Sequence, residues 1–214
     1  GDTAASTFGS GMYERGRVLD CAGTASVLCS VVEEYRPDTR NLTLVMMRSP
    51  IDGLFLPLAY INGGGMCIRW FRDNLGGGLS YNELEAEAAR IAPGAEGALF
   101  TPHFSGRVLP NNPNMKGSFV GLDFVHTRGH LYRAVLESIA YEYRYYLDVL
   151  RALYPQDDFN SMVTIGGGAN SGLFCQIKAD VLGLNVSTFD MGETALLGSA
   201  VIAAYGTGAI TDYQ

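Results

Sequence analysis

The chain has 214 residues, of which 47% are hydrophobic and 17% are charged, and this is the composition of an ordinary globular domain. Its formal net charge is −7 and it contains no basic run, which excludes a nucleic acid as an expected partner. There is no signal peptide and no apolar run of about 18 residues, so we expect a cytoplasmic protein that makes no membrane contact.

The first half of the chain predicts a helix, four strands and two more helices, in that order. The first two strands pair around the turn at Gly23-Thr24, and residues 49–53, which contain a proline and a glycine, join the next two. Ser80 begins the last of these helices, and Glu83, three residues later, completes a capping box. The expected ranges are helix 3–13, strands 17–22, 26–34, 42–48 and 54–59, and helices 66–75 and 80–91.

The second half of the chain is irregular at first and then alternates between helices and strands. Residues 97–123 contain three prolines, and only short strands at 99–101 and 118–122 are expected there. From 127 to 153 apolar residues recur at helical spacing, which predicts the longest helix of the chain. The remaining ranges are strand 162–165, helix 171–182, strand 185–189 and helix 195–205. This alternation predicts an α/β fold, and the length of 214 residues is typical of one domain or two.

Three consecutive glycines, Gly166, Gly167 and Gly168, lie between an apolar strand and a helix, and Asn170 follows shortly after them. Without a Cβ the backbone can approach a ligand closely, and the free N–H groups at a helix start attract phosphate. A nucleotide-binding turn is therefore one interpretation, and a tight turn with no ligand is the other. A Rossmann-type dinucleotide site is a further alternative; it lacks the GxGxxG spacing, although Asp190 does end the next strand.

Two other segments carry candidate chemistry. The hairpin tip at Gly23-Thr24-Ala25 offers backbone amides and a hydroxyl that can clasp a terminal phosphate, unless it is an ordinary turn. Asp2 immediately precedes a helical segment, where the helix dipole favours a carboxylate. Its side chain is either an N-cap or the acceptor for the proton of a reacting hydroxyl.

The cysteines and histidines predict no metal site. Cys21, Cys29, Cys67 and Cys175 lack CxxC spacing and lie in apolar or small-residue runs, so they are expected to be reduced, buried thiols. The three histidines lack the spacing of metal ligands and are expected in loops or caps. A bound nucleotide would then be held by backbone amides, helix dipoles and Mg²⁺ instead of by a cationic surface.

The order of these segments resembles the C-terminal half of the FGGY family of sugar kinases, which includes xylulokinases, glycerol kinases and gluconokinases. The resemblance is carried by six blocks, namely Gly1-Asp2, Gly23-Thr24, residues 64–73, 100–106 and 116–122, and residues 166–180. Each pattern is common, but the same order over 214 residues is specific. Two segments depart from the family pattern. Its Gly-Glu-Arg is replaced by Ser105-Gly106-Arg107, so an acidic residue is missing, and its Glu-Gly in the long helix is Glu137-Ser138.

The resemblance implies an RNase H-like fold of the actin and Hsp70 ATPase superfamily, which is a mixed sheet with helices on both faces. It also implies that residues 1–214 form one C-terminal nucleotide-binding domain, a fragment whose N-terminal sugar-binding domain lies outside this sequence. That N-terminal domain is then an expected partner, and a homodimer is left open.

The activity implied by the resemblance is transfer of the ATP γ-phosphate to a hydroxyl of a small carbohydrate, with xylulose favoured among the sugars. ATP and Mg²⁺ are the implied cofactors. The implied site residues are the catalytic base Asp2, the phosphate-binding residues Gly23, Thr24 and Ala25, and the nucleotide-binding residues Gly166, Gly167, Gly168 and Asn170. The alternative is a non-catalytic nucleotide-binding regulatory module like actin or Hsp70, which would share the glycine turn but need no base at Asp2.

Overall fold

The computed structural model describes residues 1–189 and 192–213, so Asp190, the acidic residue considered above for the Rossmann alternative, lies outside the described residues. The strands are β1 (Val18–Ala22), β2 (Ser26–Ser30), β3 (Val45–Arg48), β4 (Phe55–Ile61), β5 (Leu99–Thr101), β6 (Ser118–Val120), β7 (Ser161–Ile165) and β8 (Asn185–Thr188). The helices are α1 (Asp2–Gly9), α2 (Gly64–Leu75), α3 (Tyr81–Ala88), α4 (Arg128–Leu153), α5 (Gly172–Leu182) and α6 (Thr194–Gly206), with short 3-10 helices η1 (Ala95–Gly97) and η2 (Gly167–Asn170).

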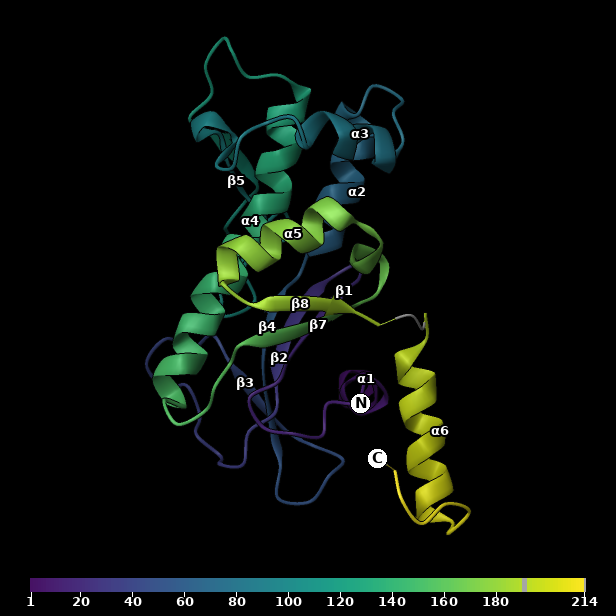
Figure 1. Ribbon diagram of the computed structural model, residues 1–214. Helices are drawn as coiled ribbons and strands as arrows, with labels where there is room; N and C mark the ends of the chain where they lie inside the picture. The colour runs from purple at the N-terminus through teal and green to yellow at the C-terminus, as the bar shows by residue number, and fades with distance from the viewer. Residues whose placement is uncertain (190–191, 214) are drawn as a thin grey trace.

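Within this part of the chain, six strands form one sheet in the order β3-β4-β2-β1-β7-β8, and β5 pairs with β6 separately. In the large sheet, β1 pairs antiparallel with β2 and parallel with β7. Antiparallel pairing continues through β4 to β3, and parallel pairing continues to β8. Helices α4 and α5 lie on one face and α1 and α6 on the other (Figure 1). The sheet is therefore mixed and has helices on both faces, as the resemblance implied.

Successive residues of β1 point into different cores, which explains why both faces of the sheet need cover. Val18 belongs to the large core that also contains the apolar residues of α4 and α5. Leu19 belongs to a smaller core with Met12 and Ile165, against which Ala4 of α1 packs. Because side chains alternate along a strand, each buried face requires its own layer of helices.

Helices α1 and α6, from opposite ends of the chain, pack backbone against backbone. A Cβ added at Gly9 would overlap the carbonyl oxygen of Thr194, and one added at Gly198 would overlap that of Ala5. Both positions therefore require glycine for this close approach. The contact fixes the position of α1 and of Asp2 in its first turn.

The strand expected at 42–48 is shorter than predicted, because its first residues belong to a loop held by hydrogen bonds of its own. The Asp38 carboxylate accepts the backbone N–H groups of Asn41 and Thr43, both at 2.8 Å. Leu42 between them has a left-handed φ of 57°. Extended backbone cannot pass through such a residue, so β3 begins only after this loop.

The termini and lengths of the helices follow local chemistry. The capping box predicted at the start of α3 is confirmed, since the Ser80 side chain accepts the N–H of Glu83 and the Glu83 carboxylate accepts the N–H of Ser80. α1 ends at Gly9, and Gly11 just beyond it has φ 75°, which ends the helix. No helix in the described ranges is both long enough and apolar enough to cross a membrane.

Candidate functional site

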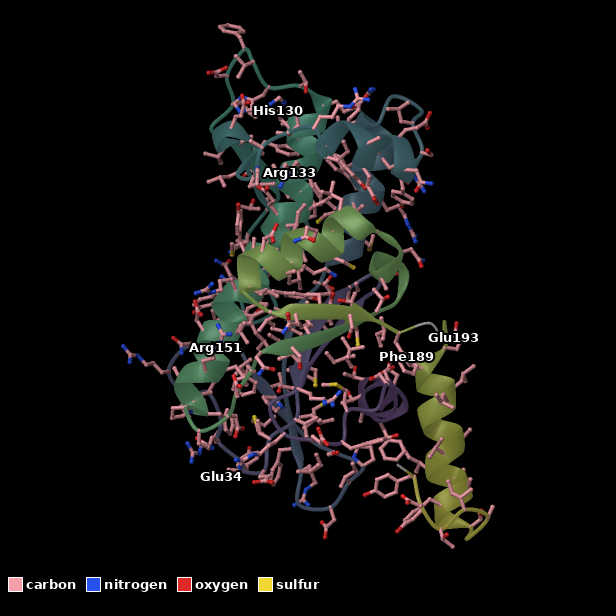
Figure 2. All side chains as sticks on the ribbon, viewed as in Figure 1. Glu34, His130, Arg133, Arg151, Phe189 and Glu193 are labelled. Atoms are coloured by element: carbon pink, nitrogen blue, oxygen red, sulfur yellow. The ribbon has the colours of Figure 1, made fainter. Side chains whose placement is uncertain are left out.

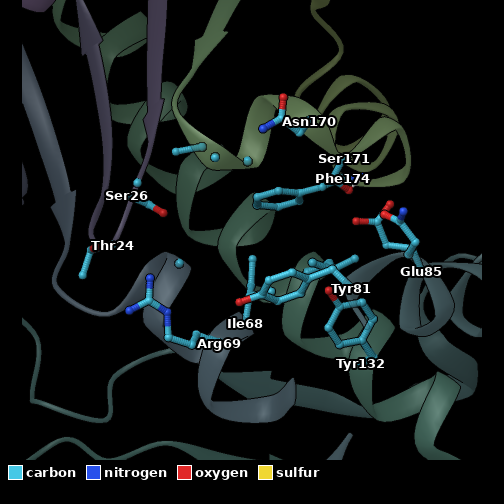
Figure 3. A pocket seen from close by; sticks show the side chains of 17 residues that line it. Thr24, Ser26, Ile68, Arg69, Tyr81, Glu85, Tyr132, Asn170, Ser171 and Phe174 are labelled. Atoms are coloured by element: carbon cyan, nitrogen blue, oxygen red, sulfur yellow. Dashed lines mark hydrogen bonds between the residues drawn. The ribbon is translucent and has the colours of Figure 1, made fainter. Parts of the chain in front are cut away.

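A cavity of about 540 Å³ opens between the tip of the β1–β2 hairpin, helices α2, α3 and α4, and the turn that leads into α5 (Figure 3). Thr24, Ser26 and Arg69 lie at its hairpin end, and Glu85 lies at the other end of the view. The lining comprises Ala22, Gly23, Thr24, Ser26, Gly65, Ile68, Arg69, Tyr81, Asn82, Glu85, Tyr132, Leu136, Gly167, Gly168, Asn170, Ser171 and Phe174.

The three glycines of the turn after β7 meet three different structural requirements. Gly166 has φ 82°, a backbone conformation that other residues rarely adopt. A Cβ added at Gly167 would meet no atom within 4 Å, and this residue lines the cavity. A Cβ added at Gly168 would lie 2.5 Å from the Cβ of Ala22, so its absence lets the turn pack against β1. Ser171 then caps α5 by accepting the N–H of Phe174 at 3.0 Å.

The hairpin tip at Gly23-Thr24-Ala25 is held against the N-terminus of α2. The N–H of Met66 donates to the carbonyl oxygen of Thr24 at 3.0 Å. A Cβ added at Gly65 would overlap the carbonyl oxygen of Gly23, and one added at Gly64 would overlap the Ser26 side chain. The glycines that begin α2 therefore bring a helix start into direct contact with the tip.

A second cavity, of about 260 Å³, contains Asp2 in its lining. Gly23 lines both cavities, so the hairpin tip forms the boundary between them. Ala25 and Gly166 also line the second cavity. Glu193, which lies at the start of α6, contributes a second carboxylate there (Figure 2).

The structure corrects one of the two interpretations of Asp2. The N-cap of α1 is Gly1, and Asp2 is the first helical residue, so Asp2 is not the cap. Its Oδ1 accepts the neighbouring N–H of Thr3 at 2.8 Å, and the side chain is exposed. The carboxylate is thus free to accept a hydrogen bond from a molecule in the second cavity.

The larger cavity has opposite charges toward its two ends. Arg69 is the one cation and Glu85 the one carboxylate among its lining residues in the described chain. Burial raises the pKa of the Glu85 carboxyl, and the Ser171 hydroxyl partly opposes this by hydrogen bonding. Burial, with the nearby Glu85 carboxylate, also raises the pKa of the Tyr132 hydroxyl. A ligand with an anionic end and a hydrogen-bond donor at its other end would match this polarity.

A buried ion pair joins β1 to α5 next to this cavity. Asp20 and Lys178 are both 0% exposed, and the Lys178 Nζ donates to the Asp20 carboxylate. The Tyr143 hydroxyl donates to Asp20 Oδ1 at 2.7 Å and the Thr164 hydroxyl to Oδ2 at 3.1 Å. Nζ also lies 4.1 Å from the ring centroid of Phe174, which lines the cavity. The strand that ends in the hairpin and the helix that follows the glycine turn are therefore linked by charge.

The cysteines are free thiols, and Cys21 lines the smaller cavity. Cys29 and Cys67 are buried, Cys21 and Cys175 are half-buried, and all four are free thiols. Burial raises the pKa of Cys67 to about 12, which leaves it a weak nucleophile. In the described ranges, no group of three or more His, Cys, Asp or Glu side chains could hold a metal ion by itself.

Sequence reasoning missed Arg69 of α2 and the wall that α3 and α4 contribute to the larger cavity. For Arg69 a signal existed, because it follows Gly65 by one helical turn and therefore shares its face. For Tyr81, Asn82 and Glu85 the local sequence holds no such signal, since only the packing of α3 against α4 brings them to the cavity.

Comparisons with known proteins agree with the order of these segments. Residues 21–207 match the family model described as "FGGY family of carbohydrate kinases, C-terminal domain". The xylulose kinase of Lactococcus lactis is 30% identical over 210 residues, covering 97% of this chain and 41% of that protein. The glycerol kinase of Burkholderia pseudomallei is 32% identical over 216 residues, covering 97% of this chain and 42% of that protein. The crystal structure of xylulose kinase from Rhodospirillum rubrum has a TM-score of 0.85 at 29% identity, and the match covers 99% of this chain and 42% of that one.

The mixed sheet, with its helices on both faces and a glycine turn beside a cavity, defines a domain of the actin and Hsp70 ATPase type. The chain belongs to the FGGY family of carbohydrate kinases and matches its C-terminal domain. It spans about two fifths of the length of the curated relatives that it matches.

Proposed function

We propose that the protein containing this chain transfers the γ-phosphate of ATP to a hydroxyl of a small carbohydrate. The observation that carries the proposal is the boundary that two cavities share at Gly23. A nucleotide in the larger cavity would reach this boundary with its terminal phosphate, and Asp2 lines the cavity beyond it. Phosphoryl transfer requires the phosphate to lie between the nucleotide and the accepting hydroxyl, and this arrangement supplies those positions.

In this proposal the larger cavity holds the nucleotide. Gly167, Gly168 and Asn170 would border the adenosine, since all three line the cavity and Gly167 leaves open space. Thr24 and the neighbouring amides would bind phosphate oxygens at the hairpin tip. Arg69 at the same end would add a charge-assisted hydrogen bond to the phosphates.

Asp2 would act as the general base. Its exposed carboxylate, at the first turn of α1, would accept the proton of the sugar hydroxyl as the new P–O bond forms. Donors at Gly23, Thr24 and Ala25 would stabilise the charge that develops on the transferred phosphoryl group. Gly166 and Ala25 line the Asp2 cavity, so these turns would shape the space in which phosphate and acceptor meet.

The smaller cavity also fits Mg²⁺, the ion that phosphoryl transfer from ATP uses. Asp2 and Glu193 line it together, and Mg²⁺ is commonly held by one or two carboxylates with phosphate oxygens and waters. Glu193 would hold the ion, which leaves Asp2 free to act as the base, and the bound ion would supply positive charge against the phosphates.

We favour a pentulose such as xylulose as the acceptor. Identity to a xylulose kinase and to a glycerol kinase is similar, at 30% and 32%. The acidic residue of the family's Gly-Glu-Arg is also missing at Ser105-Gly106-Arg107. The N-terminal domain as partner, a homodimer and a cytoplasmic location stay predictions.

The non-catalytic alternative, a nucleotide-binding regulatory module, would need the larger cavity alone. It gives no role to a carboxylate placed across the hairpin tip from the nucleotide. The presence of Asp2 in the adjoining cavity therefore supports an enzyme.

The proposal is tested by coupled ADP release from the protein that carries this chain, with a panel of ketoses, polyols and sugar acids. We expect one of these sugars to stimulate release, and Asp2→Asn to lower kcat by about a hundredfold or more. Asp52→Asn, the same change in an exposed turn, is the control and should leave kcat unchanged. Normal kcat in Asp2→Asn, or no stimulation by any sugar in the panel, would rule the proposal out.

A further inference from the structure

Glu85 is a carboxylate in the larger cavity for which the proposed reaction gives no role. It projects from α3 at the end of the cavity away from Thr24 and Arg69 (Figure 3). The other acids of this helix are engaged elsewhere, Glu83 with Ser80 and Glu87 with Arg128. Glu85 forms no ion pair within the described ranges, and it is half-buried.

An ionised carboxylate can only accept hydrogen bonds, so Glu85 requires a hydrogen-bond donor from a ligand bound in the cavity. A half-buried acid without a cation is costly, and burial already raises its pKa. The Ser171 hydroxyl satisfies part of this need. The remaining acceptor capacity faces the cavity.

The surroundings of Glu85 indicate the class of donor. Phe174 lies above and Tyr81 below in the view of Figure 3, and both line the cavity. Aromatic walls of this kind suit a flat, unsaturated ring. Arg69 at the opposite end suits phosphate. A nucleotide would therefore lie with its phosphates toward Arg69 and its base toward Glu85.

We propose that Glu85 is a specificity-determining residue, whose carboxylate accepts a hydrogen bond from an amino group of a purine base. The inference rests on the proposed function, because it needs a nucleotide in this cavity. Adenine carries an amino group on its ring, and a purine without one would leave Glu85 with no donor from the base. The cavity would therefore discriminate between bases of the same shape.

The test compares two ligands that differ only in that amino group, ADP and purine riboside 5′-diphosphate. Binding of each to the 214-residue chain is followed by NMR titration, with 2′-deoxy-ADP as a third ligand. We expect the chain to bind ADP about tenfold more tightly than the ligand without the amino group, as for a hydrogen bond to a charged acceptor. Glu85→Ala should bind these two ligands equally, while its preference for ADP over 2′-deoxy-ADP stays that of the unsubstituted chain.

Glu83→Ala is the matched control on the same helix. The substitution removes the carboxylate of the capping box and so weakens the start of α3, whereas Glu83 itself does not line the cavity. It should keep the tenfold preference, which separates loss of helix order from loss of the hydrogen bond. The inference about Glu85 would be overturned if Glu85→Ala kept the preference for ADP over purine riboside 5′-diphosphate, or if Glu83→Ala lost that preference to the same extent. It would also be overturned if Glu85→Ala changed the preference for ADP over 2′-deoxy-ADP instead. None of these outcomes would affect the proposed nucleotide site. Failure of ADP to perturb any cavity residue would overturn the proposed nucleotide site as well, so the two failures are distinguishable.

Discussion

Replacing Lys178 by methionine would leave the Asp20 carboxylate in the core without its cation. Both side chains are completely buried, and methionine fills a similar volume with a flexible apolar chain. The hydroxyls of Tyr143 and Thr164 would still donate to Asp20, but neither carries a charge. The substitution therefore isolates the contribution of the cation.

Removal of one partner from a buried ion pair costs about 3–5 kcal/mol, because the remaining charge is left uncompensated. Two hydroxyl donors remain on Asp20, so we expect Lys178→Met at the lower end, about 3–4 kcal/mol. With an m-value of about 2 kcal/mol/M in urea, the unfolding midpoint should fall by about 1.5–2 M. The double variant Asp20→Asn/Lys178→Met buries no charge at the site of this ion pair. Its loss of unfolding free energy should be at least about 1 kcal/mol smaller than the sum of the losses in Asp20→Asn and Lys178→Met.

Urea unfolding near neutral pH, followed by circular dichroism, measures these free energies. Lys116→Met makes the same substitution at an exposed lysine and should change stability by less than about 0.5 kcal/mol. A Lys178→Met midpoint no lower than that of the control would refute the reasoning. Strict additivity in the double variant would show that the two side chains do not act as a pair.

Two further predictions concern the glycine turn and the loop before β3. Gly167→Val should fold normally but lose the ADP binding expected of this chain at about 0.1–1 mM, because the added side chain enters the cavity without meeting a protein atom. Calorimetry on Gly172→Val, whose side chain also meets no atom but lies outside the cavity, should show unchanged binding, and binding by the first variant would contradict the assignment. Burial raises the pKa of Asp38, but hydrogen bonds from Thr43 and Asn41 outweigh this effect and hold the pKa below its ordinary value. The ionised carboxylate therefore stabilises the fold at pH values above the ordinary pKa of an aspartate. This stabilisation is lost as the pH falls through the lowered pKa of the folded state. Asp38→Asn should therefore be clearly less stable than the unsubstituted chain near neutral pH, and the difference in stability should shrink as the pH falls below the ordinary pKa of an aspartate. Urea midpoints whose difference does not narrow in acid would argue against this.

The parts of the fold that could be predicted from the sequence are those encoded by neighbouring residues. The strand, glycine turn and helix around Gly166 follow from apolar spacing and missing Cβ atoms, and β7, η2 and α5 occupy those positions. The capping box of Ser80 and Glu83 is equally local. Such signals lie within a few residues of one another, so no knowledge of the tertiary structure is needed to find them.

The remaining features depend on contacts between distant segments. Glu85 reaches the cavity only because α3 packs beside α4, and no pattern in the neighbouring sequence predicts this packing. Asp20 is a different case, since an acid inside the apolar strand Val18–Ala22 is a signal that a partner must exist. That signal does not identify Lys178, because many tertiary arrangements could supply a cation. The early end of α1 and the late start of β3 likewise depend on backbone conformations such as that of Leu42.

The contact between Gly9 and Gly198 also has a consequence in time. The two glycines are about 190 residues apart, so α1 leaves the ribosome long before the helix against which it packs has been made. At about 5–20 residues per second, α1 waits about 10–40 s for its partner, with its apolar face unpaired during synthesis. Closing so long a loop is also a slow step of folding. The carboxylate at the first turn of α1 therefore reaches its final position only after one of the last segments of the chain has been synthesised.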